Sequence, residues 1–147
     1  MRISDILTAK RVYTESKADS KRAVLQFLAS KAARSFSIDE RVIFDALLER
    51  ESLGTTGFGH GVAFPHARIA NIKKIKAFVA RLDKPIDFEA VDGEPVDLLC
   101  LLISPEDSGA DHLTALAAIS RLLKDEDICK KIRKAKNNDV IYSILSK

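Results

Sequence analysis

Apolar residues recur at helical intervals in the first third of the chain and predict two helices there. In the first, the apolar positions are Val24, Phe27, Leu28 and Ala32. A side-chain oxygen that accepts a free backbone N–H favours a helix start, and Asp19 and Ser20 are the candidate N-caps. We therefore expect this helix to begin after Ala18 and to end near residues 35–37.

A second helix is predicted to start at Ser37, because Glu40 completes a capping-box pattern three residues later. Its apolar face is formed by Val42, Ile43, Ala46 and Leu47. Arg50 is the next position on that face, in the last turn before Gly54. The spacing alone favours neither of two interpretations of Arg50. Its guanidinium either reaches water and neutralises the helix C-terminus, or points into a site formed by the following loop.

Apolar runs in the middle of the chain predict three or four strands. Residues 75–82 alternate between two faces, whereas residues 98–103 are continuously apolar and indicate a strand buried on both faces. A strand at 61–64 should end at Pro65, because proline cannot donate to a sheet hydrogen bond. The expected strands are residues 10–14, 61–64, 75–82 and 95–104, with a loop at 84–88 and a turn at Asp92-Gly93.

Three helices are predicted after the buried strand. The first carries His112, Leu116, Ile119 and Leu123 on one face, flanked by Leu113, Ala117 and Ser120. His112 falls in its first turn, close to unpaired N–H groups and the positive end of the helix dipole. Two shorter helices are expected at 125–136 and 139–145. This order of elements predicts a single α/β domain with a mixed sheet over residues 1–147.

Composition and charge exclude several classes of protein. The chain has 147 residues, of which 46% are hydrophobic and 31% charged, as in a globular domain. A net charge of +3, with basic and acidic residues interleaved, does not favour nucleic-acid binding. Cys100 and Cys129 lie far apart among apolar neighbours and are expected to be reduced and buried. Without a signal peptide or an apolar membrane span in the sequence, we expect a cytoplasmic protein.

The segment from Gly54 to Arg68 is the strongest candidate for a functional site. It holds four of the six glycines and two of the three histidines, His60 and His66. No pair of histidines has the helical spacing of familiar zinc sites, so a metal is not favoured. The sequence also lacks the G-x-S-x-G motif of serine hydrolases and both glycine-rich nucleotide motifs.

The residue types around this segment suit an anion. A glycine loop and a helix N-terminus offer N–H groups, and Arg50 offers a bidentate cation. A neutral imidazole is also a nucleophile toward phosphorus, and phosphoryl transfer mainly needs positioning and charge stabilisation. His66, His112 and Arg50 are therefore the candidate site residues, although each histidine would more commonly be structural.

Three stretches of the sequence resemble a known family. Residues 47–68 (Leu-Leu-Glu-Arg-Glu-Ser-Leu-Gly-Thr-Thr-Gly-Phe-Gly-His-Gly-Val-Ala-Phe-Pro-His-Ala-Arg) are similar to the signature of IIA components of the bacterial phosphoenolpyruvate-dependent phosphotransferase system. The similarity continues through residues 84–99 and 111–116. It is greatest to the fructose/mannitol superfamily, and within it to the nitrogen-regulatory type.

The resemblance implies a three-layer α/β/α sandwich with a mixed sheet and a role for each candidate residue. His66 would accept a phosphoryl group on Nε2 from the phosphohistidine of a small HPr-type carrier. His112 would support the phosphorylated state, and Arg50 would help to hold the phosphate. His60 would be a neighbour of the site. No cofactor or metal is implied, and the glycines would let the backbone approach the phosphate and the partner.

The resemblance leaves the biological role open between a regulatory and a transport protein. A nitrogen-type IIA ends a phosphorelay and controls target proteins, whereas a transport IIA passes its phosphoryl group to a IIB domain. A regulatory binding module that never takes phosphate is a third possibility. Phe58 and Phe64 flank the site in sequence and are candidates for an apolar rim that meets the carrier; the core is the alternative place for both.

Overall fold

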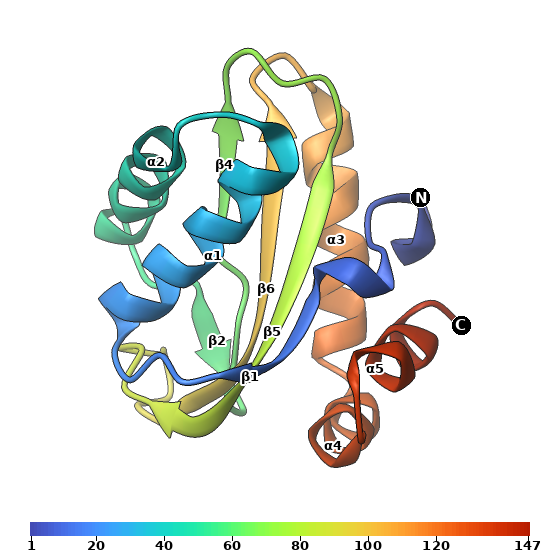
Figure 1. Cartoon of the computed structure of the whole chain (residues 1–147). Coiled ribbons are helices and arrows are strands. Elements are labelled where there is room, and N and C mark those ends of the chain that lie inside the picture. Colours follow the sequence, from blue (N-terminus) through green and yellow to red (C-terminus); the bar gives the residue numbers. More distant parts are fainter.

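The computed structural model describes all 147 residues and consists of one six-stranded sheet between two layers of helices. Helices α1 and α2 cover one face, and α3, α4 and α5 cover the other (Figure 1). The helices are α1 Lys21–Phe36, α2 Glu40–Ser52, α3 Ala110–Leu123, α4 Glu126–Lys134 and α5 Asn138–Leu145. The strands are β1 Val12–Ser16, β2 Gly57–Gly59, β3 Val62–Ala63, β4 His66–Ile69, β5 Lys76–Ile86 and β6 Val96–Pro105. The predicted α/β/α sandwich with a mixed sheet is confirmed.

Strand β6 is the centre of the sheet and pairs with three others. It runs antiparallel to β5 and parallel to both β3 and β4, while β1 is parallel to β5 and β2 antiparallel to β3. Side chains of β5 and β6 alternate between two buried clusters. One cluster, with Leu99 and Leu101, packs under α1 and α2, and the other, with Leu98 and Cys100, packs under α3 to α5. The predicted burial of β6 on both faces is confirmed.

The strand at 61–64 ends before Pro65 as predicted, since β3 ends at Ala63, but pairing with β6 resumes at once in β4, which was not predicted. Val62 lies opposite Leu98 in β3, and His66 lies opposite Leu102 in β4, so the register along β6 is unchanged across the proline. The proline carbonyl accepts a hydrogen bond from the Leu102 N–H at 3.0 Å. Pro65 therefore interrupts the ladder without ending it, and His66 lies at the start of a strand.

Two other parts of the sheet differ from what the sequence predicted. Residues 84–88 were expected to be a loop, but β5 continues to Ile86, which pairs with Val96 beyond an irregularity in the register. Strand β2 was not predicted, because three residues of Gly-Phe-Gly carry no alternating pattern. A Cβ at Gly57 would lie 3.0 Å from the Ala90 Cβ, so this glycine permits close packing of β2 on the loop between β5 and β6.

The N-cap of α1 is confirmed and that of α2 was wrongly assigned. Ser20 accepts a hydrogen bond from the Ala23 N–H, as expected of an N-cap. Ser37 instead adopts a left-handed conformation, with φ 57°, and ends α1. Asp39 caps α2 by accepting from the Arg41 N–H. The N-cap of α2 therefore lies two residues after Ser37, where it was predicted.

The C-terminal helices follow the predicted ranges, with one difference on α3. Its buried side chains are His112, Ala115, Ile119 and Leu123. Leu113, which was placed beside the apolar face, is 63% exposed. Both cysteines are buried and unpaired. None of the helices combines the length and the apolar character needed to span a membrane.

Candidate functional site

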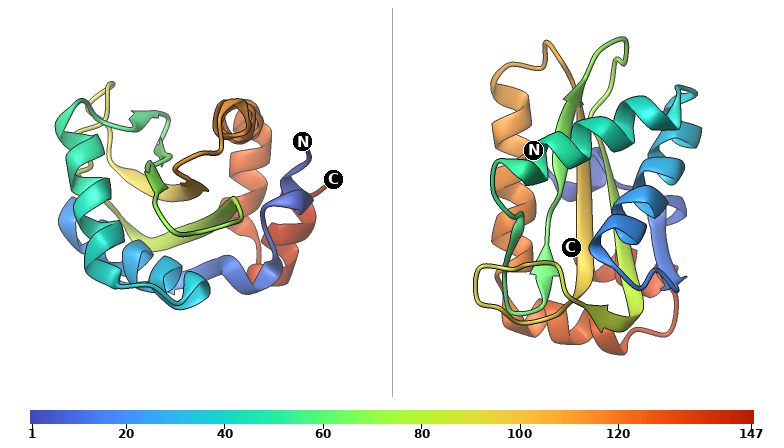
Figure 2. Two further views of the ribbon diagram at one scale, coloured as in Figure 1. Left: turned by 90° about the horizontal axis from the view of Figure 1, so that it is seen from above. Right: turned by 90° about the vertical axis from the view of Figure 1, so that its left-hand side faces the viewer.

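Arg50, His66 and His112 come from three separate elements and lie together beside the sheet. Arg50 is in the last turn of α2, His66 begins β4, and His112 is in the first turn of α3. The sheet separates the α2 side from the α3 side, so the two helices approach β4 from opposite faces (Figure 2). Arg50 Nε lies 3.3 Å from His66 Nε2, and the ring centroids of His66 and His112 are 5.7 Å apart. The structure thus brings all three predicted residues together.

The hydrogen bonds of His66 define its tautomer. Its Nδ1 lies 3.1 Å from the Phe64 carbonyl oxygen, which only accepts hydrogen bonds, so Nδ1 carries the proton. Nε2 then holds a free lone pair and accepts the hydrogen bond from Arg50 Nε. Burial lowers the pKa of His66, and the Arg50 guanidinium lowers it further, against the opposite influence of the Phe64 carbonyl and Glu51. The site therefore presents a neutral imidazole with an unprotonated Nε2.

Arg50 links the ring of His66 to the glycine loop. Its NH1 donates to the Gly54 carbonyl oxygen at 2.9 Å while Nε donates to His66. Gly54 has φ 148°, a conformation that other residues rarely adopt, and this turns its carbonyl toward the guanidinium. The structure therefore supports the interpretation in which Arg50 points into the site, and the same guanidinium holds the loop that follows α2.

Glu51 is a site residue that the sequence analysis missed. Its carboxylate is only 5% exposed and lies 3.1 Å from Lys21 Nζ. It accepts hydrogen bonds from the N–H of Thr56, at 3.0 Å, and from the Thr56 hydroxyl. These bonds fasten the loop between Arg50 and His66 to the end of α2. A buried carboxylate among charged residues of a helix end has no distinctive sequence pattern, so this role could not have been predicted.

The surroundings of His112 were also only partly foreseen. Its Nδ1 lies 2.7 Å from Ser104 Oγ, at the end of β6, and both side chains are buried. The guanidinium of Arg68 lies near the start of α3, where it donates to Ser108 Oγ and to the Gly109 carbonyl. Burial lowers the pKa of His112 to about 4, with smaller contributions from Arg68 and His66. His112 is therefore neutral near pH 7.

This low pKa makes the free energy of unfolding depend on pH. An unfolded histidine has a pKa of about 6.5, so the unfolded chain takes up this proton first as the pH falls. The stability that depends on neutral His112 is complete above about pH 6.5 and is lost progressively toward pH 4. The expected loss is about 3 kcal/mol. Chemical denaturation from pH 7 to 4 should show a smaller loss for His112→Gln than for the parent protein; equal losses would contradict this.

His60 lies outside this arrangement. It occupies the turn between β2 and β3, and its Nδ1 lies 3.2 Å from Glu126 on α4. Its backbone N–H donates to Asp92 and its carbonyl accepts from Arg133. These contacts fix the tip of the hairpin, in agreement with the prediction that His60 is not the nucleophile, and make it a suitable control residue.

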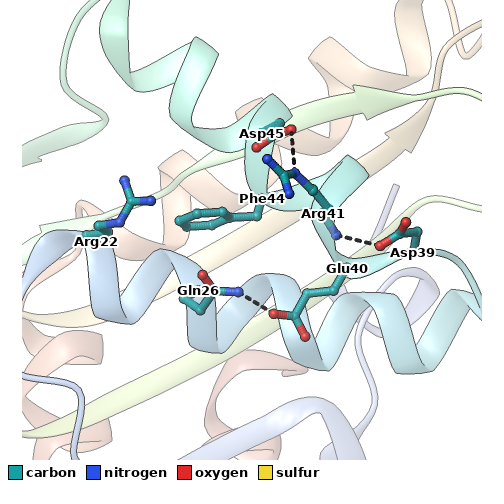
Figure 3. A pocket seen from close by; sticks show the side chains of 7 residues that line it. All are labelled: Arg22, Gln26, Asp39, Glu40, Arg41, Phe44 and Asp45. Atoms are coloured by element: carbon teal, nitrogen blue, oxygen red, sulfur yellow. Dashed lines mark hydrogen bonds and ion pairs between the residues drawn. The ribbon is translucent and has the colours of Figure 1, made fainter.

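A polar groove lies elsewhere on the molecule. It has a volume of about 440 Å³ and lies between α1 and α2, where Arg22, Asp39, Arg41 and Asp45 line it with Gln26, Glu40 and Phe44 (Figure 3). None of the three site residues borders it. The protein also has no three His, Cys, Asp or Glu side chains grouped so that they could hold a metal ion. The site itself brings together two imidazoles and a guanidinium.

Comparison with known proteins gives consistent matches over nearly the whole chain. Residues 5–147 match the family model of the phosphoenolpyruvate-dependent sugar phosphotransferase system, EIIA 2. A nitrogen regulatory protein of Bradyrhizobium diazoefficiens is 50% identical over 146 residues, which cover 99% of this chain and 95% of that protein. A fructose-specific EIIA component of Haloferax volcanii is 35% identical over 145 residues, which cover 98% and 94%.

A solved structure agrees with these sequence matches. The crystal structure of nitrogen regulatory protein IIA-Ntr from Neisseria meningitidis has a TM-score of 0.92 and 29% sequence identity, covering 97% of this chain and 98% of that one. The resemblance found in the sequence motifs is thereby confirmed. The chain belongs to the EIIA 2 family of the phosphoenolpyruvate-dependent sugar phosphotransferase system.

Proposed function

We propose that this protein is a phosphocarrier whose His66 accepts a phosphoryl group on Nε2 from the phosphohistidine of an HPr-type carrier. The observation that carries the proposal is the pair of contacts of His66, from Nδ1 to the Phe64 carbonyl oxygen and from Nε2 to Arg50 Nε. The Phe64 carbonyl retains the proton on Nδ1, so Nε2 offers its lone pair beside a guanidinium. Nucleophile and charge stabiliser are therefore in place before the donor binds.

The transfer needs no base and no metal at His66. The Nε2 lone pair forms the new N–P bond while the N–P bond of the donor breaks, and that electron pair stays on the donor's ring nitrogen. No proton has to leave Nε2, because it carries none. Arg50 can exchange its bond to Nε2 for bonds to phosphoryl oxygens, where its charge stabilises the negative charge of the moving group. The ring of His112, with its centroid 5.7 Å from that of His66, is close enough to help hold the same group.

Reconstitution tests this proposal directly. The protein is incubated with labelled phosphoenolpyruvate, enzyme I and an HPr-type protein, and its phosphate content is measured. We expect stoichiometric labelling that is stable in alkali and lost in acid, as for phosphohistidine. Labelling that survives acid, or none while the HPr-type protein itself is labelled, would contradict it.

We further propose that the phosphorylated protein is a regulatory end point in the cytoplasm. The support is its 50% identity to a protein named for nitrogen regulation. A transport role is the second candidate, because a fructose-specific EIIA component is 35% identical over a similar length. The two are separated by adding purified IIB domains of several types to the phosphorylated protein. Retention of the label supports regulation, and rapid transfer to one IIB domain supports transport.

Apolar side chains beside the site suit the docking of a carrier protein. Phe58 and Phe64 are half-buried, with ring centroids 5.1 Å apart, and Phe64 stacks on His66 at 6.1 Å. Leu53, after α2, is 81% exposed, and Leu113, beside His112, is 63% exposed. Such a partly exposed apolar surface around a reacting group favours a protein partner.

This surface gives a kinetic prediction. Phe58→Ala should raise the KM for the phosphorylated HPr-type carrier about tenfold, because it removes an aromatic contact from the interface. The value of kcat should change much less, since His66 and Arg50 remain. Val42→Ala is the matched control, because Val42 is 51% exposed at the other end of α2. Equal KM values for the two variants would show that Phe58 is not part of the docking surface.

A further inference from the structure

The hydroxyl of Ser104 is a buried polar group to which the transfer described above gives no role. Ser104 lies near the end of β6 with 0% of its surface exposed, in a run that is otherwise apolar from Leu98 to Ile103. Its Oγ lies 2.7 Å from Nδ1 of His112, which is 5% exposed. No other side-chain hydrogen bond reaches this hydroxyl. A single short contact between two buried groups fixes how each of them is protonated.

The direction of this hydrogen bond follows because the buried hydroxyl hydrogen of Ser104 needs an acceptor. If His112 Nδ1–H donated to Ser104, the serine hydrogen would be buried without an acceptor, which is costly. If Ser104 donates to Nδ1, both groups are satisfied. Neutral His112 then carries its proton on Nε2. His66 has the opposite arrangement, because its Nδ1–H donates to Phe64 and its Nε2 is bare.

The Nε2–H of His112 is available to a ligand. No group in the protein forms a hydrogen bond with this nitrogen. Every side-chain nitrogen or oxygen that is fully buried has a hydrogen-bond partner, so Nε2 of His112 cannot be fully buried. Nε2 therefore accounts for part of the small exposed area of His112, next to the ring of His66. One ring thus presents a nucleophilic nitrogen and its neighbour presents a hydrogen-bond donor.

We propose that Ser104 is a positioning residue that holds His112 in the Nε2–H tautomer, so that this N–H donates to an oxygen of the phosphoryl group on His66. The proposal rests on the phosphocarrier function. Ser104 itself does not touch the phosphoryl group and acts only through His112. Without the serine proton, neutral His112 divides between two tautomers, and in one of them a nitrogen lone pair faces the phosphate oxygens and repels them.

The tautomer is measured by NMR in protein labelled with ¹⁵N-histidine, before any phosphate is added. In the parent protein His112 should show a protonated Nε2 and an unprotonated Nδ1. Ser104→Ala should shift both nitrogens toward averaged values, and Ser104→Thr, which restores a hydroxyl, should return them. Ser108→Ala is the matched control, because Ser108 bonds Arg68 near the same helix start without touching His112. Protonated Nδ1 in the parent protein, or an unchanged tautomer in Ser104→Ala, overturns the proposal.

A second readout follows the phosphorylated protein. Ser104→Ala should shorten the lifetime of the phosphohistidine by about ten- to hundredfold, as expected when a hydrogen bond to a charged group is lost. Ser104→Thr and Ser108→Ala should remain close to the parent value. An unchanged lifetime in Ser104→Ala overturns the positioning role. If the parent protein takes no phosphate while its tautomers are as stated, the phosphocarrier function fails, and with it the donation to phosphate.

Discussion

Replacing His66 by alanine is expected to reduce phosphoryl incorporation to background. The substitution removes the only imidazole whose Nε2 is unprotonated and lies within hydrogen-bond distance of a guanidinium, at 3.3 Å from Arg50 Nε. Alanine offers no nucleophile in its place. Initial rates with phosphoenolpyruvate, enzyme I and an HPr-type protein should therefore fall by at least about a thousandfold.

His60→Ala is the matched control for this experiment. His60 lies on the same glycine-rich segment, but its ring contacts Glu126 and is 72% exposed. The control should keep close to the full rate and stoichiometry. Full acid-labile labelling of His66→Ala, with loss of label in His60→Ala, would reverse the assignment of the two histidines. Partner binding that survives His66→Ala and ignores the donor proteins would favour a binding module.

Arg50→Lys is expected to lower the rate of phosphorylation by about a hundred- to thousandfold. The guanidinium uses two separate nitrogens, Nε on His66 and NH1 on the Gly54 carbonyl, and a single ammonium cannot reproduce this planar arrangement. Charge alone therefore should not rescue the reaction. The rate is measured by rapid quench at saturating donor, so that a weakened docking step does not disguise the chemical step.

Arg41→Lys tests whether the effect belongs to the site. Arg41 lies on the same helix, and its exposed side chain pairs with Asp45 at 3.7 Å. Its substitution should leave the rate unchanged. The pKa of His66 gives an independent check, because removing the guanidinium in Arg50→Ala should raise it. A rate for Arg50→Lys within twofold of the parent would show that Arg50 stabilises the loop and not the transferred group.

Sequence patterns predicted the regular parts of the fold because those parts follow from local periodicity and burial. The continuous apolar run of β6 required helices on both faces, and both layers are present. Predictions failed where tertiary pairing overrode a local signal. Strand β4 was missed directly after Pro65, where β6 supplies the same register as it does to β3. Ser37 has the sequence of a capping residue but ends α1 in a left-handed conformation.

The site was predictable at the level of residue types but not of contacts. Helical spacing placed Arg50 on the inner side of α2 and His112 at the start of α3, but left open whether Arg50 points into the site or toward water. Glu51 and Ser104 were missed because their roles depend on buried hydrogen bonds that residue spacing does not reveal. Glu51 accepts two of them from Thr56, and Ser104 forms one with His112. A single serine in an apolar strand has no periodic signature. The role of Ser104 depends on its contact with the ring of His112.

The most direct test of the account is to identify the phosphorylated atom. Phosphorylated protein labelled with ¹⁵N-histidine is examined for coupling between ³¹P and each ring nitrogen. We predict coupling to Nε2 of His66, with Nδ1 of the same ring still protonated and bonded to the Phe64 carbonyl. Coupling to Nδ1 of His66, or to a nitrogen of His60 or His112, would contradict the account.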